Sequence, residues 1–200
     1  MHKVFISYHH QNDQAYKDLL IEYGKYFGVF LDKSVDTGEI SDSLSDQAIR
    51  GKIRDEYLRD STVTILLAGA ETKFRKHIDW ELYSSMFDGT RNKKSGILVI
   101  NLPSVGCTYF HATHGIAEKR LIYPDINSWM AVDTRAEYER RFPHLPERIV
   151  DNLMAPYAGI SVIPWERLSS DKLRRLIDWA FDGRMKREYD LRRPMRRRNA

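Results

Sequence analysis

The stretch VTILL at residues 63–67 is apolar except for one threonine, and it starts with β-branched side chains. Closed by Gly69, it predicts a central strand that is buried on both faces, as strands of parallel sheets are. Residues 97–100, with the sequence ILVI, predict a second strand of the same kind. The rest of the chain must supply helices and further strands around these two.

Shorter apolar runs predict three more strands, at residues 4–6, 29–31 and 160–163. Between the strands, apolar residues recur at helical spacing, most regularly at residues 16–23 and 173–181. Asn12 or Asp13 is expected to cap the first of these helices. Strands therefore alternate with helices along the chain. The alternation predicts an α/β fold with a doubly wound parallel sheet and helices on both faces.

The chain has 200 residues, of which 42% are hydrophobic, and this suits one domain. We expect residues 1–183 to form it. Residues 103–158 are less periodic and predict an insertion on the rim of the sheet, with helices near 135–142 and 147–153. Residues 184–200 hold eight Lys or Arg and two acids, and are interpreted as a solvated, disordered basic tail.

The formal net charge of +4 belongs to this tail, because the rest of the chain is close to neutral. A nucleic-acid-binding body would more often spread a basic face over the fold, so such a partner is not expected. No apolar run approaches the roughly 20 residues that span a bilayer. The start of the chain lacks the apolar stretch of a signal peptide. With the single cysteine Cys107, these features predict a cytoplasmic protein without a membrane partner.

Several common catalytic motifs are missing from the sequence. It has no G-x-G-x-x-G after the first strand, no Walker-type G-K-S/T and no G-x-S-x-G. His111 and His114 have a spacing that metal ligands use, but no glutamate or third ligand lies near them in the sequence. We interpret them as loop histidines and expect no metal site.

Parallel sheets place their binding sites at the carboxyl ends of the strands. Ser7, Tyr8 and His9 directly follow the first predicted strand, and residues 32–36 follow the second. We therefore expect Tyr8 and His9 to line a cleft at this edge. The alternative is a tyrosine packed on the insertion and an exposed histidine.

The segment KHIDWEL at residues 76–82 begins a third predicted helix. On a helical wheel, Ile78 and Leu82 lie on an apolar arc. His77 and Glu81 share the remaining arc and are i, i+4 neighbours that can touch. Periodicity alone favours a solvated helix edge with a contact between His77 and Glu81.

A family resemblance changes this interpretation. VFISY at residues 4–8 resembles the first conserved box of TIR domains. In their order, residues 61–69, 80–82 and 96–102 are more specifically similar to TIR-like proteins of the Thoeris antiphage defence system, the ThsB family. The resemblance covers about residues 3–102. It implies a flavodoxin-like fold of the TIR type and NAD⁺ as substrate, with no separate cofactor.

The resemblance also implies a site. The essential glutamate of the family, on the third helix, falls at Glu81. The family usually has tryptophan four residues earlier, where this chain has His77, with Trp80 nearer to the glutamate. The mobile loop of the family corresponds to residues 33–45, and Asp36 falls at one of its matching positions. The expected substrate-binding residues are Ser7, Tyr8, His9, Asp36, His77 and Trp80.

One carboxylate is sufficient for the implied chemistry. Ordinary glycosidases need a second one as an acid for the leaving oxygen. In NAD⁺ the nicotinamide is already cationic and leaves as a neutral molecule, so only the oxocarbenium-like ribose has to be stabilised. Water then captures the ribosyl cation to give ADP-ribose, or an adenine nitrogen captures it to give a cyclic product.

The resemblance thus implies an NAD⁺-cleaving enzyme that makes a cyclic ADP-ribose-type signal for a nucleotide-sensing effector, with self-association through TIR surfaces. Two alternatives stay open. One is a non-catalytic TIR adaptor that binds other TIR domains. The other is a nucleic-acid-binding protein, which rests only on the arginines of the tail. The fold alone does not decide between these functions.

Overall fold

The computed structural model describes residues 1–34, 43–90 and 92–199, and it contains a sheet of five strands that are all parallel. The strands lie in the order β2-β1-β3-β4-β5, which is the order of flavodoxin-like folds. They are β1 (His2–Ser7), β2 (Phe30–Asp32), β3 (Val63–Ala68), β4 (Gly96–Asn101) and β5 (Ser161–Pro164). The predicted α/β, doubly wound architecture of the flavodoxin-like type is confirmed.

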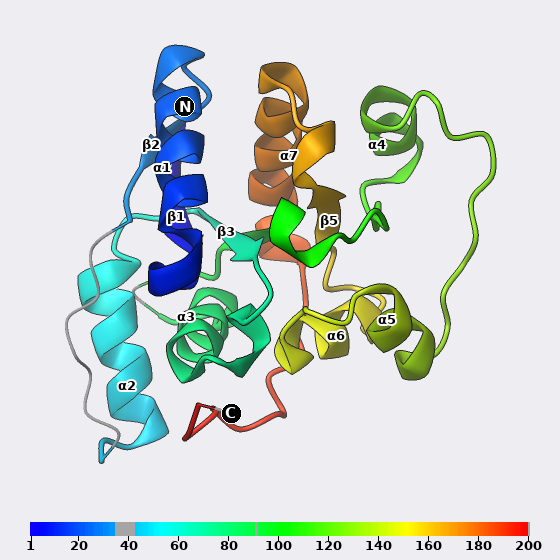
Figure 1. The fold of residues 1–200 in the computed structure, drawn as a ribbon. Coiled ribbons are helices and arrows are strands. Elements are labelled where there is room, and N and C mark those ends of the chain that lie inside the picture. The colour runs from blue at the N-terminus through cyan, green and yellow to red at the C-terminus, as the bar shows by residue number, and fades with distance from the viewer. Residues whose placement is uncertain (35–42, 91, 200) are drawn as a thin grey trace.

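Helices cover both faces of this sheet (Figure 1). On one face lie α1 (His10–Tyr26) and α7 (Ser170–Gly183), with α4 (Gly115–Ile122) in contact with α7. On the other lie α2 (Asp46–Lys52), α3 (Lys76–Met86), α5 (Arg135–Arg141) and α6 (Glu147–Met154). None of the helices in the described ranges has the length and apolar character that crossing a membrane requires.

The two central strands are buried along their whole length, as their sequence predicts. Alternate side chains serve opposite layers: Ile65 packs toward α1 and α7, whereas Leu66 packs toward α3 and α6. The start of β4 lies so close to α7 that a Cβ on Gly96 would collide with the main chain of Ala180. This close approach requires glycine at that position.

The first helix begins earlier than the sequence suggests. The turn after β1 is short, His9 occupies the N-cap position, and α1 starts at His10. Asn12 and Asp13 therefore lie inside the first turn, and the expectation that one of them caps the helix is wrong. Asp13 is instead buried.

Residues 103–158, predicted as an insertion on the rim of the sheet, also contribute side chains to the hydrophobic core. The helices expected near residues 135–142 and 147–153 are present as α5 and α6, and α4 was not foreseen. Tyr138 and Ile149 pack in the same buried cluster as Leu82 of α3 and Val99 of β4. The segment thus completes one face of the core.

The basic C-terminal segment is not a free tail, and the interpretation of it as solvated and disordered is wrong. Met195 is buried against Phe5 and Trp80. The main-chain N–H of Arg196 donates to Asp79 Oδ2 at 2.8 Å, and its carbonyl accepts from Trp80 Nε1 at 2.7 Å. We call residues 193–196 the C-terminal strap, because they cross over α3.

Candidate functional site

Strand β1 and helix α3 meet at Ser7 and Glu81. Ser7 is the last residue of β1, and its Oγ donates a 2.6 Å hydrogen bond to Glu81 Oε2. Both side chains are buried, and only 3% of Glu81 is exposed. The solvated helix edge predicted from periodicity is therefore wrong at Glu81, because this side of α3 faces the sheet and not the solvent.

Burial also changes the acidity of Glu81. It raises the pKa of the carboxyl group from the ordinary 4.5 to about 7, and the hydrogen bond from Ser7 opposes the rise only in part. A carboxyl group with such a pKa populates both protonation states near neutral pH. Strongly perturbed groups of this kind concentrate at functional sites.

Tyr8 and His9 follow Ser7 and are both buried. The Tyr8 hydroxyl donates to Gln14 Oε1 at 2.6 Å, and its ring stacks on His10 with the centroids 4.5 Å apart. Burial lowers the pKa of His9, and the positive charge of Arg75 lowers it further. The alternative of an exposed histidine at position 9 is therefore wrong.

A second buried carboxyl group, Asp13, lies beside this turn and was not foreseen as a site residue. Its carboxylate approaches Gly69 so closely that a Cβ there would collide with it. Burial raises the pKa of Asp13. Gly69 follows β3, so Asp13 lies where the carboxyl ends of two neighbouring strands meet. An acid in the first turn of a helix looks like a cap in the sequence, which concealed this position.

Trp80 does not face an accessible site. Its side chain is 0% exposed and belongs to the cluster of Phe5, Ile49 and Met195, and the indole N–H is bound to the strap. The ring of His77 packs edge-on against it, with the centroids 4.9 Å apart. In this structure Trp80 therefore offers no surface on which a nicotinamide could stack.

Asp36 lies outside the described residues, but the start of its loop is described. The Ile6 N–H donates to Ser34 Oγ at 2.9 Å, and the Ser34 N–H donates to Asp32 Oδ1 at 2.9 Å. The loop that follows β2 thus leaves the sheet one residue from Ser7. Ser34 was not singled out in the sequence, where it is an unremarkable loop serine.

His111 and His114 lie outside the helices and strands, as expected of loop histidines, and both are partly buried. Burial lowers the pKa of each to about 4. His114 Nδ1 lies 3.1 Å from Arg187 Nη2, and its ring stacks on Trp179. Within the described ranges, no group of three or more His, Cys, Asp or Glu side chains is arranged to hold a metal ion.

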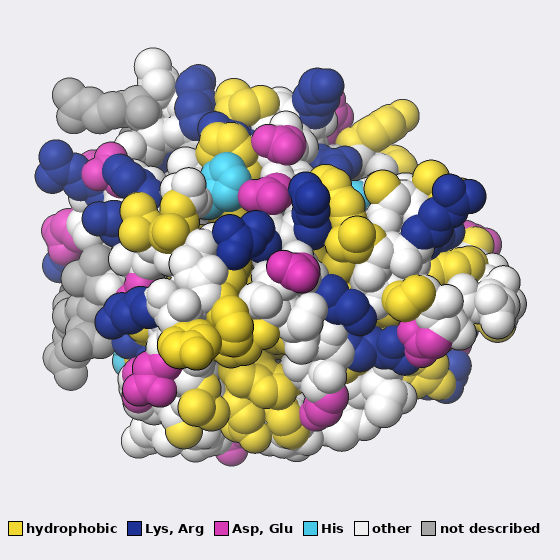
Figure 2. All heavy atoms as spheres, turned by 90° about the horizontal axis from the view of Figure 1, so that it is seen from above, with side chains coloured by type: hydrophobic (Ala, Val, Ile, Leu, Met, Phe, Trp, Pro, Cys, Tyr) yellow, Lys and Arg dark blue, Asp and Glu magenta, His cyan; other side chains and the backbone are white. Residues whose placement is uncertain are grey.

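Basic side chains do not gather into one surface on the side of α1 and α7. There, Lys and Arg alternate with Asp and Glu (Figure 2). In the C-terminal segment, Arg193 pairs with Glu147 and Asp151, and Arg197 pairs with Asp46. The tail that suggested nucleic acid thus uses much of its charge within the protein.

The chemistry available here is that of the buried carboxyl groups of Glu81 and Asp13 and of the Ser7 hydroxyl, at the carboxyl edge of a parallel sheet. A comparison with curated proteins finds no match. Residues 5–106, just over half of the chain, match the family described as Thoeris protein ThsB, TIR-like domain. The matched part contains Ser7, Glu81, the second half of β1 and the next three strands. The chain therefore belongs to the Thoeris ThsB TIR-like domain family and is a defence-related TIR protein.

Proposed function

We propose that this protein cleaves the nicotinamide–ribose bond of NAD⁺ and that Glu81 stabilises the transition state. The observation that carries the proposal is the buried Glu81 carboxyl group, held by Ser7 at the end of β1, with its pKa raised to about 7. The family match supports a TIR protein, and this carboxyl group supplies the chemistry that the reaction needs.

The electron balance of the reaction suits a single carboxylate. When the C1′–N bond breaks, its electron pair stays with the nicotinamide nitrogen, and the neutral base leaves without a proton. Positive charge develops on the ribose, where an ionised Glu81 would oppose it in a site with little water. Water then adds to C1′ and loses a proton, or an adenine nitrogen adds instead. NAD⁺ is the substrate, and the proposal requires no cofactor.

Glu81 is almost fully covered in this state, so a substrate must displace part of its surroundings. The loop at residues 33–45 begins beside Ser7, through the contact of Ser34 with the main chain of Ile6. We propose that self-association through TIR surfaces, with residues 33–45 as the candidate contact, or an infection-derived trigger, gives the substrate access to Glu81. The remaining expected substrate contacts, Tyr8, His9, Asp36 and His77, belong to this proposal.

The proposed biological output is a cyclic ADP-ribose-type product that activates a nucleotide-sensing effector in antiphage defence. A non-catalytic adaptor is the second candidate, and one observation favours it. Trp80 is fully buried, so the stacking surface for nicotinamide must come from another side chain.

The test is to incubate concentrated protein with NAD⁺ and analyse the products by mass spectrometry. We expect free nicotinamide from the wild type and a roughly 10²-fold or greater loss in Glu81→Gln, because a preorganised charge is removed. Glu22→Gln, on the exposed side of α1, is the matched control and should cleave normally. Absence of nicotinamide from the wild type would favour the adaptor. A folded Glu81→Gln protein with normal release would remove Glu81 from the mechanism.

A further inference from the structure

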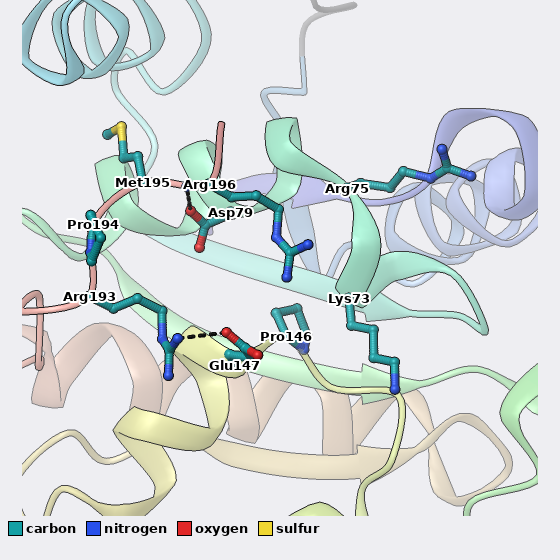
Figure 3. Close-up of a pocket in the computed structure, with 9 residues that line it drawn as sticks. All are labelled: Lys73, Arg75, Asp79, Pro146, Glu147, Arg193, Pro194, Met195 and Arg196. Atoms are coloured by element: carbon teal, nitrogen blue, oxygen red, sulfur yellow. Dashed lines mark hydrogen bonds and ion pairs between the residues drawn. The ribbon is translucent and has the colours of Figure 1, made fainter. Parts of the chain in front are cut away.

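A pocket of about 240 Å³ lies beneath the C-terminal strap. Three segments that are distant in the sequence line it: the residues before α3, the start of α6, and the strap (Figure 3). The volume is below the roughly 300–1,000 Å³ of pockets that enclose whole drug-sized ligands. The pocket therefore suits a small molecule or one group of a larger one.

This pocket is separate from the site at Glu81. Asp79 of α3 lines the pocket, and two residues along a helix turn the side chain by about 200°. Asp79 and Glu81 therefore point to opposite sides of α3. Ligand binding in this pocket therefore does not depend on NAD⁺ cleavage at Glu81.

Each of the two carboxylates of the pocket has an arginine partner. Arg148 donates from Nε to Asp79 Oδ1 at 2.8 Å and from Nη2 to Asp79 Oδ2 at 3.0 Å. Arg193 of the strap donates from Nη1 to Glu147 Oε2 at 2.6 Å, along the dashed line in Figure 3. Neither acid therefore requires Lys73 or Arg196 as its partner.

Two further cations of the lining have no carboxylate partner in the part of the chain that the structure describes. The guanidinium of Arg196 points into the pocket (Figure 3), and only its main chain is engaged, with Asp79 and Trp80. Lys73 Nζ donates to the neutral carbonyl of Pro143 at 2.6 Å. The side chain of Arg75 points away and pairs with Glu71. The pocket thus carries an uncompensated positive charge.

The start of α6 adds to this charge. Pro146 is the N-cap of an eight-residue helix and provides no side-chain cap, and both Pro146 and Glu147 line the pocket. The positive end of a helix dipole favours an anion at such a position. We propose that the pocket binds the doubly charged phosphate group of a small molecule, with Arg196 and Lys73 as its two cationic contacts.

The proposal is tested by isothermal titration of the full chain with inorganic phosphate, inorganic pyrophosphate and ADP. We expect saturable binding, weakened roughly tenfold or more in Arg196→Gln, because a charge-assisted contact is lost. This variant should fold, since Arg196 anchors the strap through its main chain. Arg198→Gln, exposed in the same segment, is the matched control for net charge and should bind within twofold of the wild type.

Tighter binding of ADP than of pyrophosphate would assign a nucleotide to the pocket, and equal binding would assign a free phosphate compound; both support the site. Lys73→Gln provides a second measurement from a different segment, with an expected loss in the same direction. Two results overturn the proposal. One is no saturable binding of any of the three probes at millimolar concentration. The other is an equal loss in Arg196→Gln and Arg198→Gln, which would indicate attraction by net charge alone.

Discussion

Helix α3 carries two buried carboxyl groups, two residues apart, with different surroundings. Asp79 is held on both oxygens by Arg148 and also accepts the main-chain N–H of Arg196. Glu81 faces the other side of the helix and is held by the neutral hydroxyl of Ser7. One acid has a compensating charge and the other has a neutral donor.

This difference gives Asp79 a structural role and leaves Glu81 for a chemical one. A buried charge that forms an ion pair is stabilised by its partner, and removing that partner lowers the stability of the fold strongly. A carboxyl group with a neutral donor keeps a raised pKa and an unused charge, which a cationic transition state can exploit. Asp79 therefore fastens α6 and the strap to α3, whereas Glu81 remains available for a substrate.

The largest effect is expected from Asp79→Ala. It leaves the buried Arg148 without its carboxylate and also removes an anchor of the strap, so the protein should lose about 3–5 kcal/mol of stability. Urea unfolding measures this loss. Asp182→Ala, on the exposed side of α7, is the control and should change stability by no more than about 0.5 kcal/mol. Equal, small losses in both variants would show that the pairing of Asp79 does not hold the fold.

A smaller effect of opposite sign is expected from Glu81→Gln. The pKa of Glu81 is about 7 in the folded protein and is near 4.5 when unfolded, so the folded state retains the proton as pH rises. Wild-type stability should therefore fall between about pH 4.5 and 7, by at most about 3 kcal/mol. Glu81→Gln lacks this dependence. In thermal melts from pH 5 to 8, the melting temperature of the variant should rise relative to that of the wild type. A difference that stays constant with pH would contradict the raised pKa.

The sequence was sufficient to predict the sheet, because central strands such as 63–67 carry their own apolar pattern over consecutive residues. The same local logic failed on α3. The polar arc of His77 and Glu81 looks solvated on a wheel, yet Glu81 faces β1. On the other side of the helix, Asp79 binds partners 69 and 117 residues further along the chain. Contacts of that separation leave no periodic signal.

The C-terminal segment shows the same limit. Its many arginines predicted a solvated tail, but Met195 fills a gap beside Trp80, and the main chain at residues 193–196 satisfies buried donors of Arg148 and Trp80. Every residue has a main-chain carbonyl that can accept a hydrogen bond, whatever its side chain. Composition therefore could not reveal the strap, nor that it would bury the indole expected at the substrate site.

The smallest effect is expected from Ser7→Ala, which tests the Glu81 side of the comparison alone. The Ser7 hydroxyl favours the ionised form of Glu81, so its loss should raise the pKa of that carboxyl group further. At pH 7 a larger fraction of Glu81 would be protonated, and nicotinamide release should fall by up to roughly tenfold, the scale of one hydrogen bond to a charged group. Because ionisation of Glu81 is shifted to higher pH and not abolished, release should recover toward the wild-type rate at higher pH.

The measurement is the pH profile of nicotinamide release for both proteins. A loss that is equal at every pH would mean that Ser7 acts on the reaction by a route other than the ionisation of Glu81.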